Sequence, residues 1–113
     1  MYNFIPYYGD TGNLPTNENH INIRWAYPGV KVLFSFTRRG DAIVMHFSAD
    51  KKGRRKIKQA IMELCNFLFD NFKWCKAIVG PVKKASIVRI GYKCGFELAG
   101  IKDDISIMMR KRI

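Results

Sequence analysis

Six cationic side chains lie within eight consecutive positions near the middle of the chain: Lys51, Lys52, Arg54, Arg55, Lys56 and Lys58. A second basic group comprises Lys83, Lys84, Arg89 and Lys93. The first fifty residues carry equal numbers of acidic and basic side chains, so the whole net charge of +11 lies in residues 51–113. Such a density of cations predicts an anionic partner, although charged runs also serve simply as solvated surface.

Other side chains that could react are sparse. Cys65, Cys75 and Cys94 have no Cys-x-x-Cys spacing, and the chain contains 2 histidines. This set favours reduced, structural thiols over a disulfide framework or a zinc cluster, and we predict no metal site. Asp103 and Asp104 are adjacent carboxylates between two apolar runs. That arrangement is more typical of a solvated turn than of a catalytic pair.

The basic cluster is preceded by three short β-branched and aromatic runs. They predict antiparallel strands over residues 21–27, 30–37 and 42–48. Next, Ile57, Ile61, Leu64 and Leu68 recur at helical spacing, which predicts one long helix over residues 53–72. A strand over 76–79, a helix over 83–94 that Gly95 ends, and strands over 96–101 and 105–109 complete the chain. This order predicts an α/β fold with a mixed sheet, in which the strands at 42–48 and 76–79 are parallel neighbours that splay apart near the long helix.

Length and composition limit the organisation of the chain. Its 113 residues, 48% of them hydrophobic, can bury one modest core. Residues 1–20 are rich in Asn, Gly, Pro and Tyr without a period, so we predict an irregular N-terminal arm followed by one domain over residues 21–113. The arm tyrosines Tyr2, Tyr7 and Tyr8 would form an interaction surface or cap a sheet edge. We find no membrane-spanning run and no signal-like N-terminus, and we predict a cytoplasmic protein.

Three segments carry a family resemblance: RRKIKQAIM at residues 54–62, AIV at 77–79, and KCGFELAG at 93–100. Together they resemble motifs A and B of the GNAT acetyltransferase superfamily. The resemblance covers residues 22–113, lacks the family's first strand and leading helices, and is most specific at KCGFELAG. The chain looks especially like small GNAT-like proteins of tailed phages, including an internal virion type, which would place it in the host cytoplasm or the virion. The family resemblance implies a GNAT-like fold.

The resemblance also implies acetyl-CoA as the cofactor. Family enzymes bind its pyrophosphate with Q/R-x-x-G-x-G/A, whose glycines let backbone N–H groups at a helix start approach the phosphates. Here Gly53 falls at the Q/R position, and Lys56 and Lys58 replace the two small residues. Charge then takes over part of the phosphate binding. The cofactor-binding residues that we predict are Ser48, Gly53, Arg54, Arg55, Lys56, Lys58 and Lys84.

The same comparison implies the catalytic candidates. In the family a Tyr four residues before the Gly-Phe pair protonates the leaving thiolate. Counting back from Gly95 reaches Gly91, and Tyr92 is one residue further on. One helical residue is a rotation of about 100°, which aims the phenol at a different surface. His46 lies in the strand that corresponds to the one gripping the acetyl group. We therefore predict Tyr92 as the acid and His46 as the base, with a structural role as the alternative for His46.

Three functions stay open. The first is acetyl-CoA binding with weak or absent N-acetyltransferase activity, because both motifs are altered. The second is a catalytically inert phage GNAT-fold protein that binds a host or phage protein or forms part of the virion. The third is a basic module that binds nucleic acid, supported by charge alone, since no helix-turn-helix, zinc-finger or RNP motif is present. Homodimer formation and the acetyl acceptor are not specified.

Overall fold

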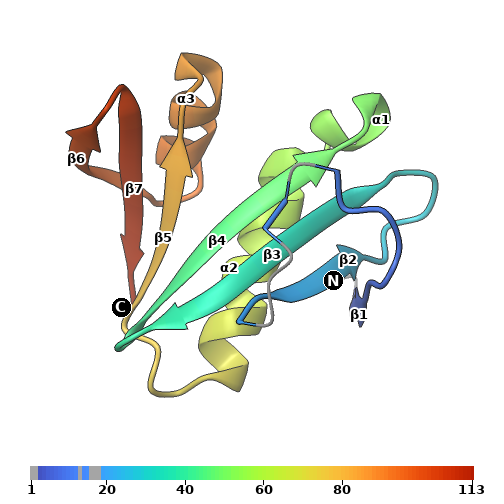
Figure 1. The fold of residues 1–113 in the computed structure, drawn as a ribbon, viewed down its shortest axis with the longest axis horizontal. Coiled ribbons are helices and arrows are strands. Elements are labelled where there is room, and N and C mark those ends of the chain that lie inside the picture. Colours follow the sequence, from blue (N-terminus) through green and yellow to red (C-terminus); the bar gives the residue numbers. More distant parts are fainter. Residues whose placement is uncertain (1–2, 13, 16–18) are drawn as a thin grey trace.

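A mixed seven-stranded sheet with the order β1-β2-β3-β4-β5-β7-β6 forms the body of the protein (Figure 1). The computed structural model describes residues 3–12, 14–15 and 19–113. Its elements are β1 Phe4–Pro6, β2 Ile21–Trp25, β3 Val32–Arg39, β4 Ala42–Ala49, α1 Lys51–Arg54, α2 Ile57–Asn71, β5 Ala77–Val82, α3 Ala85–Lys93, β6 Glu97–Lys102 and β7 Ile105–Lys111. The fold class and the order of the predicted elements are confirmed.

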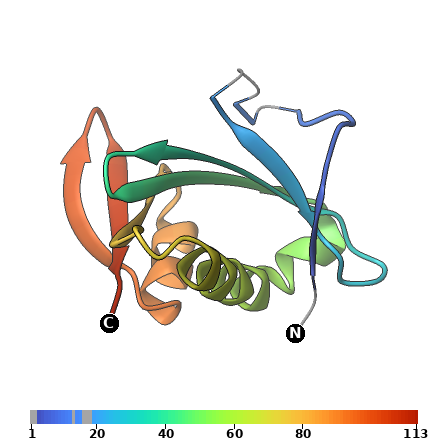
Figure 2. The same ribbon diagram turned by 90° about the horizontal axis from the view of Figure 1, so that it is seen from below.

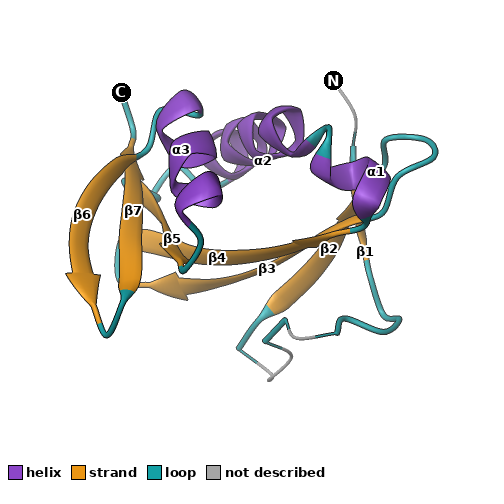
Figure 3. Cartoon of the chain, turned by 90° about the horizontal axis from the view of Figure 1, so that it is seen from above, coloured by secondary structure: helices purple, strands orange, loops and turns teal. Residues whose placement is uncertain are grey.

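The helices lie on one face of the sheet, and the described residues between β1 and β2 lie toward the other face (Figures 2 and 3). The predicted apolar stripe of α2 is buried at Ile57, Ile61, Leu64 and Leu68. It packs in one core with residues from β2, β3, β4, β5 and β7. Burial of each such side chain contributes about 1.5–3 kcal/mol, so this stripe attaches α2 to the sheet.

Turns between the strands have the backbone geometry that their residues permit. Gly40, between β3 and β4, has a φ of 63°. Asp103 and Asp104 join β6 to β7 with φ values of 51° and 64°. Two left-handed residues are what a tight hairpin requires to match the strand twist, and Asp tolerates this conformation better than most residues. The prediction of a turn at these two carboxylates is confirmed.

The prediction of one helix over residues 53–72 is wrong. The segment forms the short α1 and the long α2, separated at Arg55 and Lys56, where the φ of Lys56 is −111°. Asp50 caps α1 by accepting a hydrogen bond from the Gly53 amide at 2.7 Å. This local cap and the packing of Gly53 against Val32 turn the chain before α2 begins, and periodicity does not reveal either contact.

The arm contains a regular element that the sequence did not predict. Phe4–Pro6 forms β1 and pairs antiparallel with β2, with Phe4 opposite Trp25. Three residues are too few to produce a visible alternation, and Pro6 is compatible with an edge strand because the outer edge needs no N–H donor. Thus β1 covers the edge of β2, whereas Tyr8 remains 93% exposed. Tyr2 lies outside the described residues.

The opposite end of α2 is anchored by a C-terminal arginine. Arg112 donates hydrogen bonds to the carbonyls of Phe69 and Phe72, each at 2.8 Å, and to that of Cys75 at 2.7 Å. Phe69 and Phe72 lie at the end of α2, where carbonyls lack helical partners, and Cys75 lies in the segment that leads to β5. Arg112 therefore ties the end of α2 to the start of β5. In the described part of the chain, no helix is long and apolar enough to cross a membrane.

Candidate functional site

The two parallel strands at the centre of the sheet separate after three residue pairs. Ala42, Ile43 and Val44 of β4 pair with Ala77, Ile78 and Val79 of β5, and the pairing ends there. Beyond this point β4 continues to Ala49 while β5 follows β7 through Val82. The predicted splay is confirmed, and we call this opening the fork. It removes strand partners from the edge of β4 that faces β5.

Helix starts and cations gather above the fork. Because β4 and β5 are parallel, the segments that follow them, α1 with α2 and then α3, begin at the same edge of the sheet (Figure 1). The amide of Ala60 donates to the Lys56 carbonyl at 3.0 Å. The amides of residues 57–59 belong to the first turn of α2, where a helix supplies no carbonyl of its own to accept from them. They leave donors and a partial positive charge at this edge.

Most of the predicted cofactor-binding side chains surround this helix start. Arg54, Arg55, Lys56 and Lys58 are exposed, and Lys84 is exposed immediately before α3. The Lys56 ammonium lies 5.4 Å from the ring centre of Tyr27. Ser48 is exposed near the end of β4. The fold therefore collects cations from two separate segments at one edge of the sheet.

Gly53 has a packing role at this edge. A Cβ atom at this position would lie 2.8 Å from Val32 Cγ2 and 3.1 Å from the Lys31 carbonyl oxygen. Its amide is already bound by the Asp50 carboxylate, and that hydrogen bond is the main cause of a lowered pKa at Asp50. The amide of Gly53 is thus committed to the cap of α1, in contrast to the amides of residues 57–59.

The two predicted catalytic side chains belong to opposite layers. Tyr92 lies on α3, in the helical layer, and is 51% exposed. Gly91, at the position of the family phenol, faces β7, since a Cβ there would lie 3.2 Å from Met108 Cε. His46 lies on β4, where the alternating residues Ile43 and Met45 face the helices and are buried. The His46 ring therefore projects from the arm-covered face.

His46 has an unusual environment on that face. Its Nδ1 atom is buried and has no hydrogen-bond partner among the described residues. Burial is the main cause that lowers the pKa of His46, and the neighbouring His20, with ring centres 6.4 Å apart, lowers it further. The neutral imidazole is consequently favoured near pH 7, which is the form that accepts a proton.

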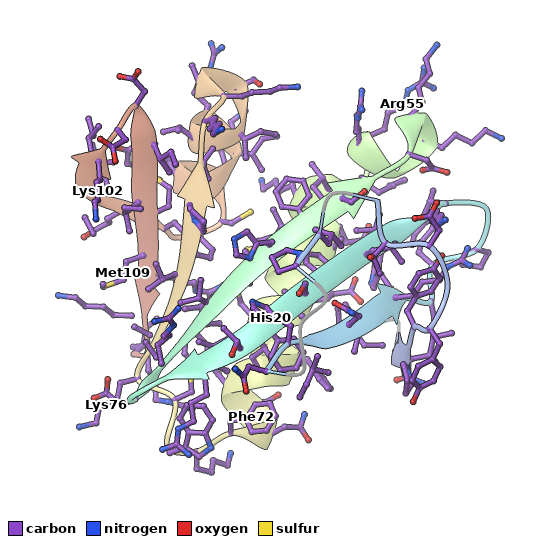
Figure 4. The ribbon with its side chains drawn as sticks, in the orientation of Figure 1. His20, Arg55, Phe72, Lys76, Lys102 and Met109 are labelled. Carbon is purple, nitrogen blue, oxygen red and sulfur yellow. The ribbon has the colours of Figure 1, made fainter. Side chains whose placement is uncertain are left out.

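The sequence reasoning missed a hollow on the arm-covered face. Asn19 and His20 from the arm and Thr37, Arg38 and Arg39 from β3 line a cavity of about 460 Å³. His20 lies over the sheet, in a different region from Arg55 at the helix start (Figure 4). The pair Arg38-Arg39 before Gly40 was the only sequence signal. Nothing in the spacing indicated that the arm would lie against it.

The cysteines are free and buried, as predicted. Desolvation raises the pKa of Cys65 to about 12 and also raises those of Cys75 and Cys94. A thiol in such a site remains protonated and unreactive near neutral pH. These residues fill the core and contribute no nucleophile to the fork.

Neither a protein-family model nor a curated protein matches the sequence. Solved structures do. AAC(6')-Ib in complex with ribostamycin and coenzyme A aligns with a TM-score of 0.68 at 15% identity, over 84% of this chain and 65% of that one. The GNAT domain of S. lividans PAT aligns with a TM-score of 0.67 at 10% identity, over 83% of this chain and 61% of that one. The ribosomal-protein-S18-alanine N-acetyltransferase from Escherichia coli aligns with a TM-score of 0.65 at 16% identity, over 85% of this chain and 71% of that one. The fold is that of the GNAT acetyltransferases, and the chain spans just under two thirds of the first two structures.

Proposed function

We propose that the protein binds acetyl-CoA at the fork and has weak or absent N-acetyltransferase activity. The observation that carries this proposal is the coincidence of the fork with the open start of α2 and its exposed cations. Phosphates would bind at Arg54, Arg55 and Lys56 and at the amides of residues 57–59, while the pantetheine arm would run along the unpaired edge of β4. A solved GNAT structure with coenzyme A has a similar fold, which supports this choice of ligand.

Two features argue for slow chemistry. Gly91 stands where a phenol would protonate the thiolate, and it packs against Met108. Lys56 and Lys58 replace small residues beside the phosphates. Loss of a positioned general acid typically lowers a rate by about 10²- to 10⁴-fold. Any remaining transfer would use Tyr92 as the acid and His46 as the base.

The first test is calorimetry with acetyl-CoA and with CoA. Replacing Arg54, Arg55 and Lys56 together by Ala should abolish binding, because it removes the phosphate-binding charge beside the α2 amides. A variant in which three exposed lysines elsewhere, Lys73, Lys102 and Lys111, are changed to Ala has the same net charge and serves as the matched control. Retained affinity in the first variant, or equal loss in both, would contradict binding at the fork.

A thiol-release assay then measures transfer to a panel of amines. Slow or undetectable release with intact acetyl-CoA binding is the expected result. Rapid transfer that survives both Tyr92→Phe and His46→Ala would mean that the active site lies elsewhere. A DNA duplex tested in the same way distinguishes acetyl-CoA binding from non-specific binding of polyanions. Non-specific binding should weaken steeply between about 50 and 200 mM salt.

The second candidate is an inert GNAT-fold interaction protein, which includes the phage virion type. A specific observation favours it: all of β6 is exposed at the edge of the sheet, with Leu98 42% and Ile101 68% exposed. An edge strand with apolar side chains can add a strand from another chain. Sedimentation of the protein alone tests homodimer formation through this edge, with Ile101→Lys expected to disrupt it.

A further inference from the structure

The last strand of the sheet, β6, has one edge without a neighbouring strand in the described part of the chain. All six of its residues, Glu97–Lys102, are exposed, and its two larger apolar side chains, Leu98 and Ile101, are 42% and 68% exposed. Unpaired N–H and C=O groups along such an edge can bind a further strand. The arrangement of the side chains on β6 indicates which strand fits.

A shift in strand register at Ala99 determines which side chains of β6 share a face. Leu98 pairs with Met108 of β7 and Ile101 pairs with Ser106, and the shift lies between these two pairs. Met108 belongs to the core beneath the helices, and Ser106, two residues away in the same strand, faces the same side. Leu98 and Ile101 therefore both project from the helix-covered face. In a regular strand, residues three positions apart would project from opposite faces.

The charged residues at the two ends of β6 share the opposite face. Glu97 pairs with Met109 and Lys102 with Ile105, and these two partners are four residues apart in β7. Met109 is adjacent to Met108, so both partners face away from the helices. Glu97 and Lys102 are about 15 Å apart along the strand, which is too far for a salt bridge within one chain. Each is therefore placed to pair with a charge on another molecule.

The side-chain order of β6 is complementary to itself. When two copies of a strand pair antiparallel about a two-fold axis, residues opposite each other share a face, and every pair occurs twice. The register that uses all of β6 gives these pairs between the two copies: Glu97 with Lys102, Leu98 with Ile101, and Ala99 with Gly100. The first pair joins opposite charges on one face, and the second joins apolar side chains on the other face.

The shift at Ala99 also excludes the neighbouring register. A slip of one residue would set Leu98 opposite Gly100. Gly100 pairs with Ile107, which is adjacent to Met108 and faces away from the helices. Because Leu98 faces the helices, these two residues could not lie opposite each other in one sheet.

The distribution of charge favours β6 as the place where two molecules meet. The cations at residues 51–58 surround α1, whereas β6 lies on the other side of the molecule, as the positions of Arg55 and Lys102 show (Figure 4). Residues 97–104 contain three carboxylates and one lysine. This acidic segment reduces the repulsion between two molecules that each carry a net charge of +11.

We propose that two copies of the chain pair β6 with β6 in this register and form one sheet that continues through both molecules. The partner that completes β6 is then a second copy of the chain rather than a strand of another protein. In the sheet order, β5 and β7 lie between the fork and β6, so both forks stay open. The dimer does not rest on acetyl-CoA binding.

Sedimentation equilibrium of the native protein measures the dimer. Two six-residue strands bury less than the roughly 1,200 Å² of standard interfaces, so we expect a weak dimer with a Kd of about 10–100 μM. A protein that stays monomeric up to about 1 mM overturns the proposal.

Charge substitutions test the register. Glu97→Lys and Lys102→Glu should each raise the Kd by about tenfold or more, because each turns two attractive pairs into two repulsive ones. They change the net charge in opposite directions, so an effect of overall charge alone would weaken one dimer and strengthen the other. Asp70→Lys and Lys73→Glu make the same changes at exposed positions outside β6 and should alter the Kd by less than about threefold. Equal loss in these controls, or no loss in the β6 variants, overturns the pairing.

Mixing the two β6 variants gives the sharpest outcome. In a dimer of one Glu97→Lys chain and one Lys102→Glu chain, both cross-strand charge pairs are attractive again. Native mass spectrometry, with one variant labelled with nitrogen-15, should show mixed dimers at concentrations at which neither variant dimerises alone. Circular dichroism confirms that both variants fold. Absence of preferential mixed dimers overturns the register.

Calorimetry with acetyl-CoA separates this dimer from the proposed function. Glu97→Lys should bind acetyl-CoA with native affinity, because Glu97 lies outside the fork. Acetyl-CoA binding by a protein that remains monomeric would overturn the dimer and leave the proposed function standing. A dimer with the expected charge dependence that binds no acetyl-CoA would overturn the proposed function and support the dimer.

Discussion

Gly53→Ala separates the packing role of this residue from a role in ligand binding. The new methyl carbon would lie 2.8 Å from Val32 Cγ2, 2.8 Å from Asp50 Oδ1 and 3.1 Å from the Lys31 carbonyl oxygen. Val32 is fully buried, and the Lys31 oxygen accepts a hydrogen bond from the Asp50 amide at 3.0 Å. Neither neighbour can move without disturbing β3 or the α1 cap.

Opposing terms determine the magnitude. Overpacking of a tight site costs about 1–3 kcal/mol, and displacement of the Asp50 cap costs about 0.5–2 kcal/mol. Replacing Gly by Ala recovers about 0.4–1 kcal/mol by restricting the unfolded chain. We therefore expect the free energy of unfolding to fall by about 1–3 kcal/mol. For a domain of this size each kcal/mol lowers the melting temperature by about 4 °C.

Urea and thermal unfolding of Gly53→Ala measure this effect, with Gly100→Ala as the matched control. A Cβ at Gly100 meets nothing within 4 Å, so the free energy of unfolding of Gly100→Ala should differ from that of the native protein by less than about 0.5 kcal/mol. If Gly53→Ala unfolds at the same urea concentration and the same temperature as the native protein, the packing argument is refuted. Acetyl-CoA affinity, measured below the unfolding transition, should fall little, because the Gly53 amide is already bound to Asp50.

Three further predictions concern stability and catalysis. Because the folded pKa of His46 is lowered, the unfolded state takes up its proton first; unfolding measurements should show stability being lost as the pH falls below about 6.5, and His46→Gln should flatten this dependence. Arg112→Ala should lower the free energy of unfolding by about 1.5–3 kcal/mol, since three carbonyls lose a charged donor, and chemical denaturation should show no comparable change in the exposed neighbour variant Lys111→Ala. Tyr92→Phe should lower any residual kcat, by less than the roughly 10²- to 10⁴-fold typical of a well-positioned general acid, with little change in acetyl-CoA affinity; an unchanged rate of thiol release would remove Tyr92 as the acid.

Most of the secondary structure was predictable from local patterns, because an element that packs against a core repeats its apolar residues at its own helix or strand period. The apolar spacing of α2 is visible in the sequence, and all four residues of the predicted stripe are buried. The strand boundaries shift by a few residues, as between the predicted 30–37 and the observed Val32–Arg39. The break at Lys56 was not predictable, because Gly53 meets Val32 across a gap of about twenty residues in the sequence.

Part of the candidate site was also predictable from local sequence, and part of it was not. The cations at residues 54–58 adjoin one another in the sequence, so they meet in any fold that starts a helix there. Lys84 joins that edge only because β4 and β5 are parallel. Gly91 was recognised by counting from Gly95, but the structure was needed to show that a Cβ there would lie 3.2 Å from Met108 Cε, which is a tight contact.

The sequence by itself determined the charge of the helix start, the order of the elements and the altered positions of the acetyl-CoA motif, because each depends on residues close together along the chain. Only the tertiary structure decided that Tyr92 and His46 lie in opposite layers and that residues 19 and 20 line a hollow with Arg38 and Arg39. These relations depend on the sheet register, which pairs Thr37 with Val44 and ends the β4 and β5 pairing at Val79. Register is set by packing across the whole core, and a shift of one residue would move every side chain to the other face.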